Sequence, residues 1–238
     1  MDTILSPRRR QLLAGLGAFA AVGHARAGVT PRSAYAAFGG TTMGSTWTVR
    51  CDTAGHDPQR LQAAVQAALD AVDARMSMYR ADSELSRLNR AAAGAVAVSD
   101  SLYAVLAAAA QVSDWSDGAF DVTVAPLVEA WGFGTHRVRR RPDAAVLARG
   151  RQLVDRRGLS LDATRRVAIK HAAGLAIDLG GIAKGYGVDG AAAALDARGV
   201  RNYLVEAGGE VRTRGINAEA RPWRVGIEAP DSAVQRAR

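Results

Sequence analysis

Cysteine, histidine, lysine and aromatic residues are all scarce in this chain of 238 residues. Cys51 is the single cysteine and cannot form an internal disulfide, and the four histidines do not recur at the spacing of metal ligands. These absences argue against a disulfide framework, a thiol mechanism and a zinc site. The chain is 48% hydrophobic and 23% charged, a composition that predicts one large folded domain.

Acidic residues are outnumbered by basic ones, and the formal net charge is +8. A nucleic-acid partner usually requires basic residues gathered on one face together with aromatic side chains, whereas here the positive residues are spread along the chain. Nearly all of them are arginines, a bias that fits the base composition of the gene, and Lys170 and Lys184 are the two exceptions. We therefore expect no nucleic-acid partner.

The N-terminus has the order of features that a secretory signal requires. A basic cluster containing Arg9 and Arg10 precedes a weakly apolar run over 12–23, and the small residues Ala25 and Ala27 follow. The paired arginines resemble the twin-arginine export signal. A permanent membrane anchor is the alternative, but the apolar run is broken by glycines and is shorter than the ~20 residues that span a bilayer.

We therefore predict a signal peptide over 1–27, cleaved after Ala27, and a folded domain over 28–238. The signal carries four arginines and one acidic residue, so part of the net charge belongs to targeting. The predicted location is the periplasm, with no stable transmembrane segment, and association with the inner membrane is left open.

Hydrophobic periodicity predicts a strand and then a long helix in the first half of the domain. Polar and apolar side chains alternate over 45–51, as they do in a half-buried strand. A helix is predicted from Asp57 and Pro58 onward, because apolar residues then recur three or four positions apart. The buried face of this helix is expected to contain Leu61, Val65, Leu69, Val72 and Met76.

Further helices are predicted from Ser99 or Asp100 to Gly118, and from Pro142 onward with an interruption at Gly150. Short strands are predicted at 166–170, 174–178, 202–206 and 223–227. Helices and strands mix without a strict βαβ alternation, so the predicted fold class is α+β, with mixed or antiparallel sheets packed against helices.

The segment DLGGIAKGYGVDG, at 178–190, places an acid, two adjacent glycines and one of the two lysines in a single turn. It is predicted to follow a strand that ends at Asp178 and to open a helix that ends at Gly199. Backbone N–H groups in such a turn and at a helix N-terminus can converge on phosphate oxygens, and Lys184 adds a positive charge. The alternative is structural, with Asp178 as a helix cap and Lys184 as a surface charge.

Six segments follow one another along the chain: TMGSTW (42–47), MSMYRADSELSRLN (76–89), GAFDVTVAPLVEAWGFG (118–134), IDLGGIAKGYGVD (177–189), YLVEAGGEVRTRG (203–215) and WRVGIEAP (223–230). Their order and spacing over about 190 residues resemble those of the FAD:protein FMN transferase family, the ApbE-like proteins. The resemblance implies a single T-fold-like domain. It also implies cleavage of FAD at its pyrophosphate, with magnesium, and transfer of FMN to a threonine of an acceptor flavoprotein with release of AMP.

The resemblance implies FAD contacts at positions before the glycine turn. They are Met43, Tyr79, Ala119, Phe120 and Asp121. Three of these positions also have a structural interpretation: Met43 can be a core residue at a strand end, Tyr79 a loop aromatic and Phe120 a buried anchor.

Within the glycine turn, the resemblance implies that Asp178 and Lys184 contact FAD and that the backbone carbonyl of Gly181 binds magnesium. A compact ammonium near the pyrophosphate would stabilise the charge that grows on the bridging oxygen as the bond breaks. The catalytic residue itself is not identified, and Lys184 is the candidate for charge stabilisation.

ApbE-like proteins extend further than this sequence does, and the extra part is expected to contribute a carboxylate and a threonine to the magnesium site. We therefore expect the domain over 28–238 to be C-terminally incomplete, with the remaining magnesium ligands beyond residue 238. Two alternatives to the transferase stay open, a non-catalytic FAD-binding accessory protein and an FAD pyrophosphate hydrolase.

Overall fold

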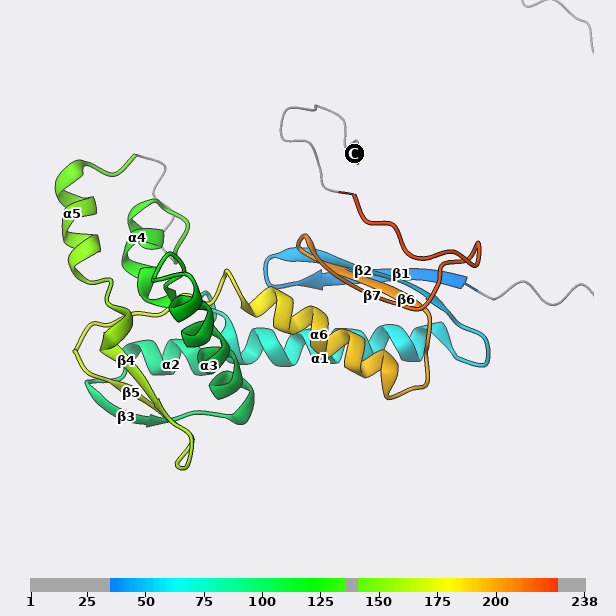
Figure 1. The fold of residues 1–238 in the computed structure, drawn as a ribbon, viewed down its shortest axis with the longest axis horizontal. Helices are drawn as coiled ribbons and strands as arrows, with labels where there is room; N and C mark the ends of the chain where they lie inside the picture. The colour runs from blue at the N-terminus through cyan, green and yellow to red at the C-terminus, as the bar shows by residue number, and fades with distance from the viewer. Residues whose placement is uncertain (1–34, 136–140, 227–238) are drawn as a thin grey trace, which may run out of the picture. The chain divides into compact units, whose positions relative to one another are not determined.

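The structure is a computed structural model, and it describes residues 35–135 and 141–226. The predicted signal over 1–27 lies outside the described residues. The largest sheet has four antiparallel strands in the order β1-β2-β6-β7, so the first two strands pair with the last two (Figure 1). Its strands are β1 (Tyr35–Thr42), β2 (Ser45–Asp52), β6 (Tyr203–Ala207) and β7 (Glu210–Arg214).

Both hairpins of this sheet close with two-residue turns at the same end. Met43 and Gly44 have φ of 46° and 72°, and Gly208 and Gly209 have φ of 57° and 94°. Positive φ at both central residues gives the turn twist that matches antiparallel strands. The amide of Gly208 donates to the carbonyl of Thr46 at 3.1 Å, so the two turns lie side by side.

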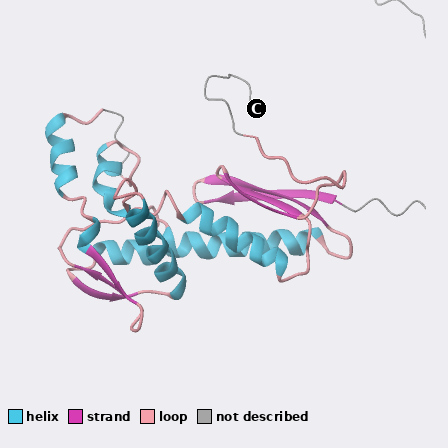
Figure 2. Cartoon of the chain, in the orientation of Figure 1, coloured by secondary structure: helices cyan, strands magenta, loops and turns pink. Residues whose placement is uncertain are grey.

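Two long helices, α1 (Pro58–Met76) and α6 (Ala183–Asp196), cover one face of this sheet (Figures 1 and 2). Asp57 caps α1 by accepting from the amide of Gln59 at 2.9 Å, and the five predicted apolar residues of that helix are all buried. The core between helices and sheet contains aliphatic side chains from both helices and alternate residues of β2 and β6, with Trp47 and Tyr203 as its largest members. The predictions of the strand at 45–51, the helix from Pro58 and the α+β class are confirmed.

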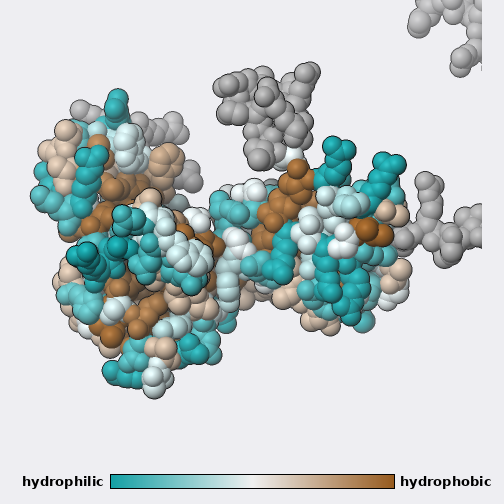
Figure 3. Space-filling model, in the orientation of Figure 1, coloured by the Kyte–Doolittle hydropathy of each residue, from teal (hydrophilic) through white to brown (hydrophobic). Residues whose placement is uncertain are grey.

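Between α1 and α6 the chain forms a second group of elements with its own apolar core. The helices of this group are α2 (Glu84–Arg90), α3 (Asp100–Trp115), α4 (Ala125–Ala130) and α5 (Ala144–Gln152), with the 3-10 turns η1 (Val122–Val124) and η2 (Arg156–Gly158). A small antiparallel sheet has the order β3-β5-β4, from β3 (Gly94–Ala97), β4 (Leu159–Asp162) and β5 (Val167–Lys170). Apolar side chains on the face shown in Figure 3 gather mainly over this second group.

Several predictions of local structure are wrong. Residues 174–178 form no strand, because the backbone of Ile177 pairs with the side chain of Asn89 instead of with a neighbouring strand. Residues 223–226 also form no strand, and residue 227 lies outside the described part. Gly150 does not interrupt α5. It is buried where the helix contacts α4, and a Cβ there would lie 2.8 Å from a methyl carbon of Leu127.

Lys170, at the end of β5, is almost fully buried, with 1% of its surface exposed. Its Nζ donates to three backbone carbonyls at the C-terminal end of α2, those of Leu88, Asn89 and Ala91, at 3.2, 2.9 and 2.8 Å. Burial lowers the pKa of this ammonium. A compact group with three donors thus binds three carbonyls at a helix end, where the helix cannot pair its last carbonyls, although the Leu88 carbonyl also accepts from the amide of Ala91 at 3.2 Å.

Across residues 35–135 and 141–226, none of the helices has both the length and the apolar character needed to cross a membrane.

Cys51 is fully buried in β2, and burial together with the charge of Asp52 raises the pKa of its thiol to about 11, against an ordinary value of 9.0.

This pKa predicts a loss of stability at high pH. In the unfolded chain the thiol ionises near pH 9, whereas in the folded chain it stays protonated to about pH 11, so rising pH favours the unfolded chain between these values. We expect the free energy of unfolding to fall by about 2 kcal/mol more in the native chain than in Cys51→Ala over this window. Urea denaturation of both chains from pH 8 to pH 11, under reducing conditions, measures the difference. Parallel pH profiles would show that the thiol does not titrate in this way.

Candidate functional site

A cavity of about 290 Å³ lies where α1 ends and α6 begins. Four of the residues predicted from the sequence line it, namely Met43, Tyr79, Asp178 and Lys184. They reach it from different parts of the chain, because the β1–β2 turn, the loop after α1 and the turn before α6 all lie at this end of the two helices. Its other lining residues are Val72, Asp73, Met76, Ser77, Met78, Val128, Phe133, Gly180 and Ala183.

The glycine turn before α6 is held by two hydrogen bonds of Asp178, one from its backbone and one from its side chain. The amide of Asp178 donates to the carbonyl of Val122 at 2.7 Å, and the Asp178 carboxylate accepts from the amide of Gly180 at 2.7 Å. Asp178 therefore closes its own turn. The structural alternative expected it to cap α6, and this is wrong. Ile182 occupies the N-cap position of α6 and gives no side-chain hydrogen bond. The amide of Ala183 donates to the carbonyl of Leu179 at 2.8 Å, whereas the amides of Lys184 and Gly185 have no hydrogen-bond partner among the described residues and are open to an anion.

Lys184 lies in the first turn of α6 and is half-buried. Its side chain runs past the β6–β7 turn, where a Cβ on Gly208 would lie 3.0 Å from the Cδ of Lys184 and 3.4 Å from the Oγ of Ser45. Glycine at 208 thus leaves room for the lysine and also supplies the positive φ of the turn. No carboxylate among residues 35–135 and 141–226 pairs with the Lys184 ammonium, so its charge is available to a ligand.

Two exposed aromatic side chains border the cavity. Tyr79 is 65% exposed and Phe133 is 72% exposed, and the hydroxyl of Tyr79 donates to the carbonyl of Phe133 at 2.7 Å. Each ring therefore presents a large apolar surface to solvent next to the polar glycine turn. An aromatic ligand can stack on such surfaces.

The loop that carries Tyr79 is fixed by the buried hydroxyl of Ser83. This hydroxyl donates to the carbonyl of Ser77 at 2.5 Å and accepts from the amide of Ser86 at 2.9 Å, so it caps α2 and holds the preceding loop together. The segment that carries Phe133 is fixed by Glu129, whose carboxylate accepts from the amide of Thr135 at 2.8 Å. Both aromatic walls of the cavity thus rest on ordered supports.

The predicted trio at 119–121 does not line the cavity. Ala119 is exposed, and the Phe120 ring lies against the glycine turn, 3.1 Å from where a Cβ on Gly181 would be. Asp121 accepts from the amide and the hydroxyl of Thr123, both at 2.8 Å, and so caps η1. In this structure Phe120 contacts the glycine turn, and Asp121 caps η1, whose Val122 carbonyl accepts from the amide of Asp178. The contacts of Ala119, Phe120 and Asp121 with FAD stay predictions.

Asp73, Ser77 and Phe133 line the cavity but were not singled out in the sequence. Asp73 contacts Arg80 at 3.5 Å in an ion pair between α1 and the Tyr79 loop. Phe133 could have been found from the sequence, because it lies in WGFG (131–134), the end of the segment at 118–134 that resembles the ApbE-like proteins. Asp73 is adjacent to the apolar face of α1 and looked like an ordinary helix-surface acid.

Magnesium binding at Gly181 is not supported by a ligand set in the described residues. Gly181 is exposed, and its carbonyl would be one oxygen ligand. The parts of the chain that the structure describes contain no group of three or more acidic, histidine or cysteine residues placed to hold a metal ion. Magnesium usually needs near-octahedral oxygen ligation with a carboxylate, which this turn alone does not provide.

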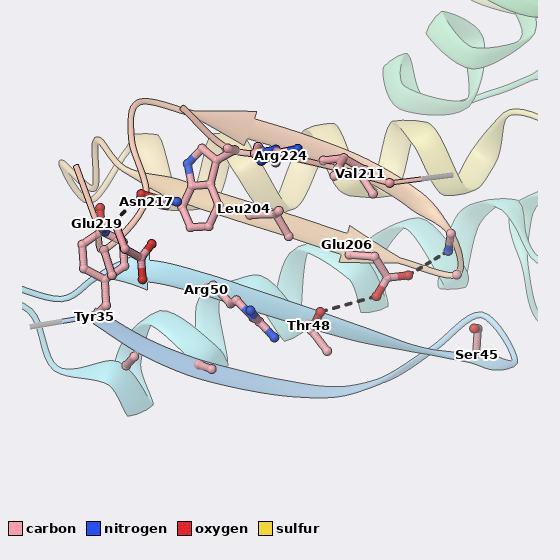
Figure 4. Close-up of a pocket in the computed structure, with 18 residues that line it drawn as sticks. Tyr35, Ser45, Thr48, Arg50, Leu204, Glu206, Val211, Asn217, Glu219 and Arg224 are labelled. Carbon is pink, nitrogen blue, oxygen red and sulfur yellow. Dashed lines mark hydrogen bonds between the residues drawn. The ribbon is translucent and has the colours of Figure 1, made fainter. Parts of the chain in front are cut away.

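A larger hollow of about 1190 Å³ lies on the other face of the four-stranded sheet (Figure 4). Arg50, Thr48 and Glu206 point from the strands into it, and Tyr35 lies at one end. Trp223 also lines the hollow, with its ring centroid 6.3 Å from that of Tyr35. Glu206 accepts from the amide of Gly209 at 2.8 Å. None of the residues predicted to bind FAD or magnesium lines this hollow.

The sequence of this chain is similar to known proteins of the ApbE family. The profile of the ApbE family matches residues 43–238. Among curated proteins, the FAD:protein FMN transferase of Haemophilus influenzae is 37% identical over 206 residues, covering 83% of this chain and 60% of that protein. The protein of the same name from Vibrio cholerae is 39% identical over 198 residues, covering 80% of this chain and 58% of that protein.

Solved structures agree in fold. The flavin transferase ApbE of Vibrio cholerae superposes with a TM-score of 0.79 at 37% identity, covering 85% of this chain and 67% of that one. The apo flavinyl transferase ApbE of Pseudomonas stutzeri gives a TM-score of 0.75 at 38% identity, covering 82% of this chain and 66% of that one. The chain thus spans about 60% of the length of the two curated relatives.

The packing of Gly134 predicts how firmly the Phe133 wall is held. Gly134 is buried against Glu129, and a Cβ at this position would overlap the carboxylate that binds Thr135. We expect Gly134→Ala to lower the free energy of unfolding by about 1–3 kcal/mol, because the carboxylate must leave its place. Urea denaturation measures the change.

The matched control is Gly190→Ala in α6, where nothing lies within 4 Å of the added Cβ. Alanine favours the helix there by roughly 0.5–1 kcal/mol. Equal stability of the two variants would show that the Glu129 contact does not fix this segment.

Proposed function

Since this chain belongs to the ApbE family, we propose that it binds FAD and takes part in the transfer of FMN from FAD to an acceptor protein. The observation that carries the proposal is Lys184, a cation without a carboxylate partner in the described residues, in the first turn of a helix whose N-cap makes no side-chain hydrogen bond. A pyrophosphate fits this place, because it needs both positive charge and free backbone amides.

The proposed pose follows from the two kinds of surface around the cavity. The pyrophosphate lies over the glycine turn and Lys184, and the isoalloxazine ring lies against the exposed aromatic wall of Tyr79 and Phe133. Met43 borders the same cavity from the β1–β2 turn. Phe120 lies against the glycine turn, beside the proposed position of the pyrophosphate, and contacts of Ala119, Phe120 and Asp121 with FAD belong to the proposal.

In the proposed reaction, a threonine hydroxyl of the acceptor attacks the phosphorus of the FMN half. The bond from that phosphorus to the bridging oxygen breaks, AMP leaves with this oxygen, and the hydroxyl gives up its proton to a base. Lys184 stabilises the negative charge that grows on the bridging oxygen. This role needs a positive charge that is in place before the reaction begins, and the position of Lys184 in the first turn of α6 provides it.

Magnesium belongs to the proposal as a requirement to be tested, and we assign no step to it. The Gly181 carbonyl is one oxygen in a site that would need several more, including a carboxylate. Periplasmic action is likewise proposed from the twin-arginine pattern over 1–27, which agrees with a reaction on exported acceptor flavoproteins.

The two alternatives use the same cavity. An FAD pyrophosphate hydrolase would place water where the threonine attacks, and an accessory protein would bind FAD without cleaving it. The release of AMP from FAD and magnesium, with and without an acceptor protein that contains the threonine, separates the three. Release that depends on the acceptor supports transfer, release without it supports hydrolysis, and tight binding without release supports the accessory role.

Lys184→Met tests the carrying observation, because methionine keeps an unbranched stem beside Gly208 and removes the charge. We expect the Kd for FAD, measured by flavin fluorescence, to rise about tenfold, equivalent to about 1.4 kcal/mol. Arg60→Ala is the control, since it removes one positive charge from an exposed site at the opposite end of α1. An unchanged Kd in Lys184→Met, or an equal rise in both variants, would return Lys184 to the status of a surface charge.

A further inference from the structure

The proposed function assigns no role to the buried lysine, Lys170. It is 1% exposed, and it contacts three carbonyls in place of a carboxylate. Burying an ammonium is costly unless each donor is satisfied, and an apolar side chain at the end of β5 would avoid that cost. The three contacts therefore hold the last turn of α2 in place.

The residue in the middle of that last turn is Asn89, and its side chain contacts the segment before the glycine turn. Its amide nitrogen donates to the carbonyl of Ile177 at 2.8 Å, and its amide oxygen accepts from the amide of Ile177 at 2.9 Å. One side chain thus satisfies both backbone groups of Ile177, as a neighbouring strand would do. This explains why 174–178 stays in place without pairing in a sheet.

The contact between Asn89 and Ile177 is half-buried, and buried apolar residues flank it. Ile177 and Leu179 are in the apolar core on either side of Asp178, with 0% and 1% of their surfaces exposed. From Leu179, whose carbonyl accepts from the amides of Ile182 and Ala183 at 3.0 and 2.8 Å, the chain enters α6 directly. The register set at Ile177 therefore determines where Asp178 and Lys184 lie.

We propose that Asn89 is a positioning residue for the glycine turn, and that Lys170 orients Asn89 by holding the C-terminal carbonyls of α2. Neither residue lines the cavity or touches the ligand in the proposed pose. The consequence for FAD rests on the proposed function, whereas the effect on the turn does not.

The test compares Asn89→Leu, which removes both hydrogen bonds to Ile177, with Leu195→Ala. Leu195 is fully buried near the other end of α6, so its truncation lowers stability without contacting the turn. Amide hydrogen exchange of the FAD-free chain and the Kd for FAD are measured below the melting temperature of both variants. A structural role alone would move the melting temperature but neither of these two readouts.

We expect exchange at 177–183 to be at least about tenfold faster in Asn89→Leu and unchanged in Leu195→Ala. The Kd for FAD is expected to rise by about tenfold in the first variant only. Lys170→Met should speed exchange over 88–91 and at Ile177 together. Unchanged exchange at 178–183 in Asn89→Leu would overturn the proposal.

Asn89→Asp is the second variant if the leucine chain does not fold. It keeps the acceptor for the Ile177 amide and loses the donor to the Ile177 carbonyl, so a smaller increase in exchange over the same residues is expected, and no increase would overturn the proposal. If the parent chain fails to bind FAD, the proposed function is wrong, while exchange at the turn still decides the role of Asn89.

Discussion

The antiparallel packing of α1 and α6 on one sheet determines the rest of this structure. Because β2 pairs with β6, α1 ends and α6 begins at the end of the sheet that also carries both hairpin turns. Gly187 lets the helices and the β1–β2 turn approach closely, since a Cβ there would lie 3.1 Å from the Met43 methyl and 3.3 Å from Leu69. Everything inserted between the helices must leave and return at this one place. The cavity is the consequence of that constraint.

The two lysines show how one residue type serves opposite purposes. Lys170 is buried, and its ammonium donates three hydrogen bonds to backbone carbonyls, which stabilise the charge inside the fold. Lys184 is half-buried beside a glycine and lacks a carboxylate partner in the described parts of the chain, so its charge is available to a ligand in the cavity that it lines. In both places the compact ammonium is better suited than a guanidinium, which is planar and needs a broader site. A chain rich in arginine therefore keeps lysine where space is limited.

Sequence patterns predicted the elements whose burial follows a simple period. The buried face of α1, the strand at 45–51 and the start of α6 after a glycine turn could all be derived from spacing alone. The strand predicted at 174–178 was wrong because its apolar residues are buried by a side-chain contact from Asn89, far away in the sequence. Similarly, Asp73 and Phe133 enter the site only through tertiary contacts. Local periodicity reports which residues are buried, but it does not report what buries them.

The supports of the cavity differ on its two sides, and the difference suits a ligand with two different halves. The glycine turn is tied to two elements at once, by the Asn89 side chain and the Val122 carbonyl, and it leads into a long helix. On the aromatic side, Ser83 and Glu129 hold the segments that carry Tyr79 and Phe133, but the two rings themselves are largely exposed. Charge stabilisation requires groups that do not move as the reaction proceeds, whereas stacking tolerates adjustment. In the proposed pose, the pyrophosphate therefore lies on the rigid side and the flavin ring on the adjustable side.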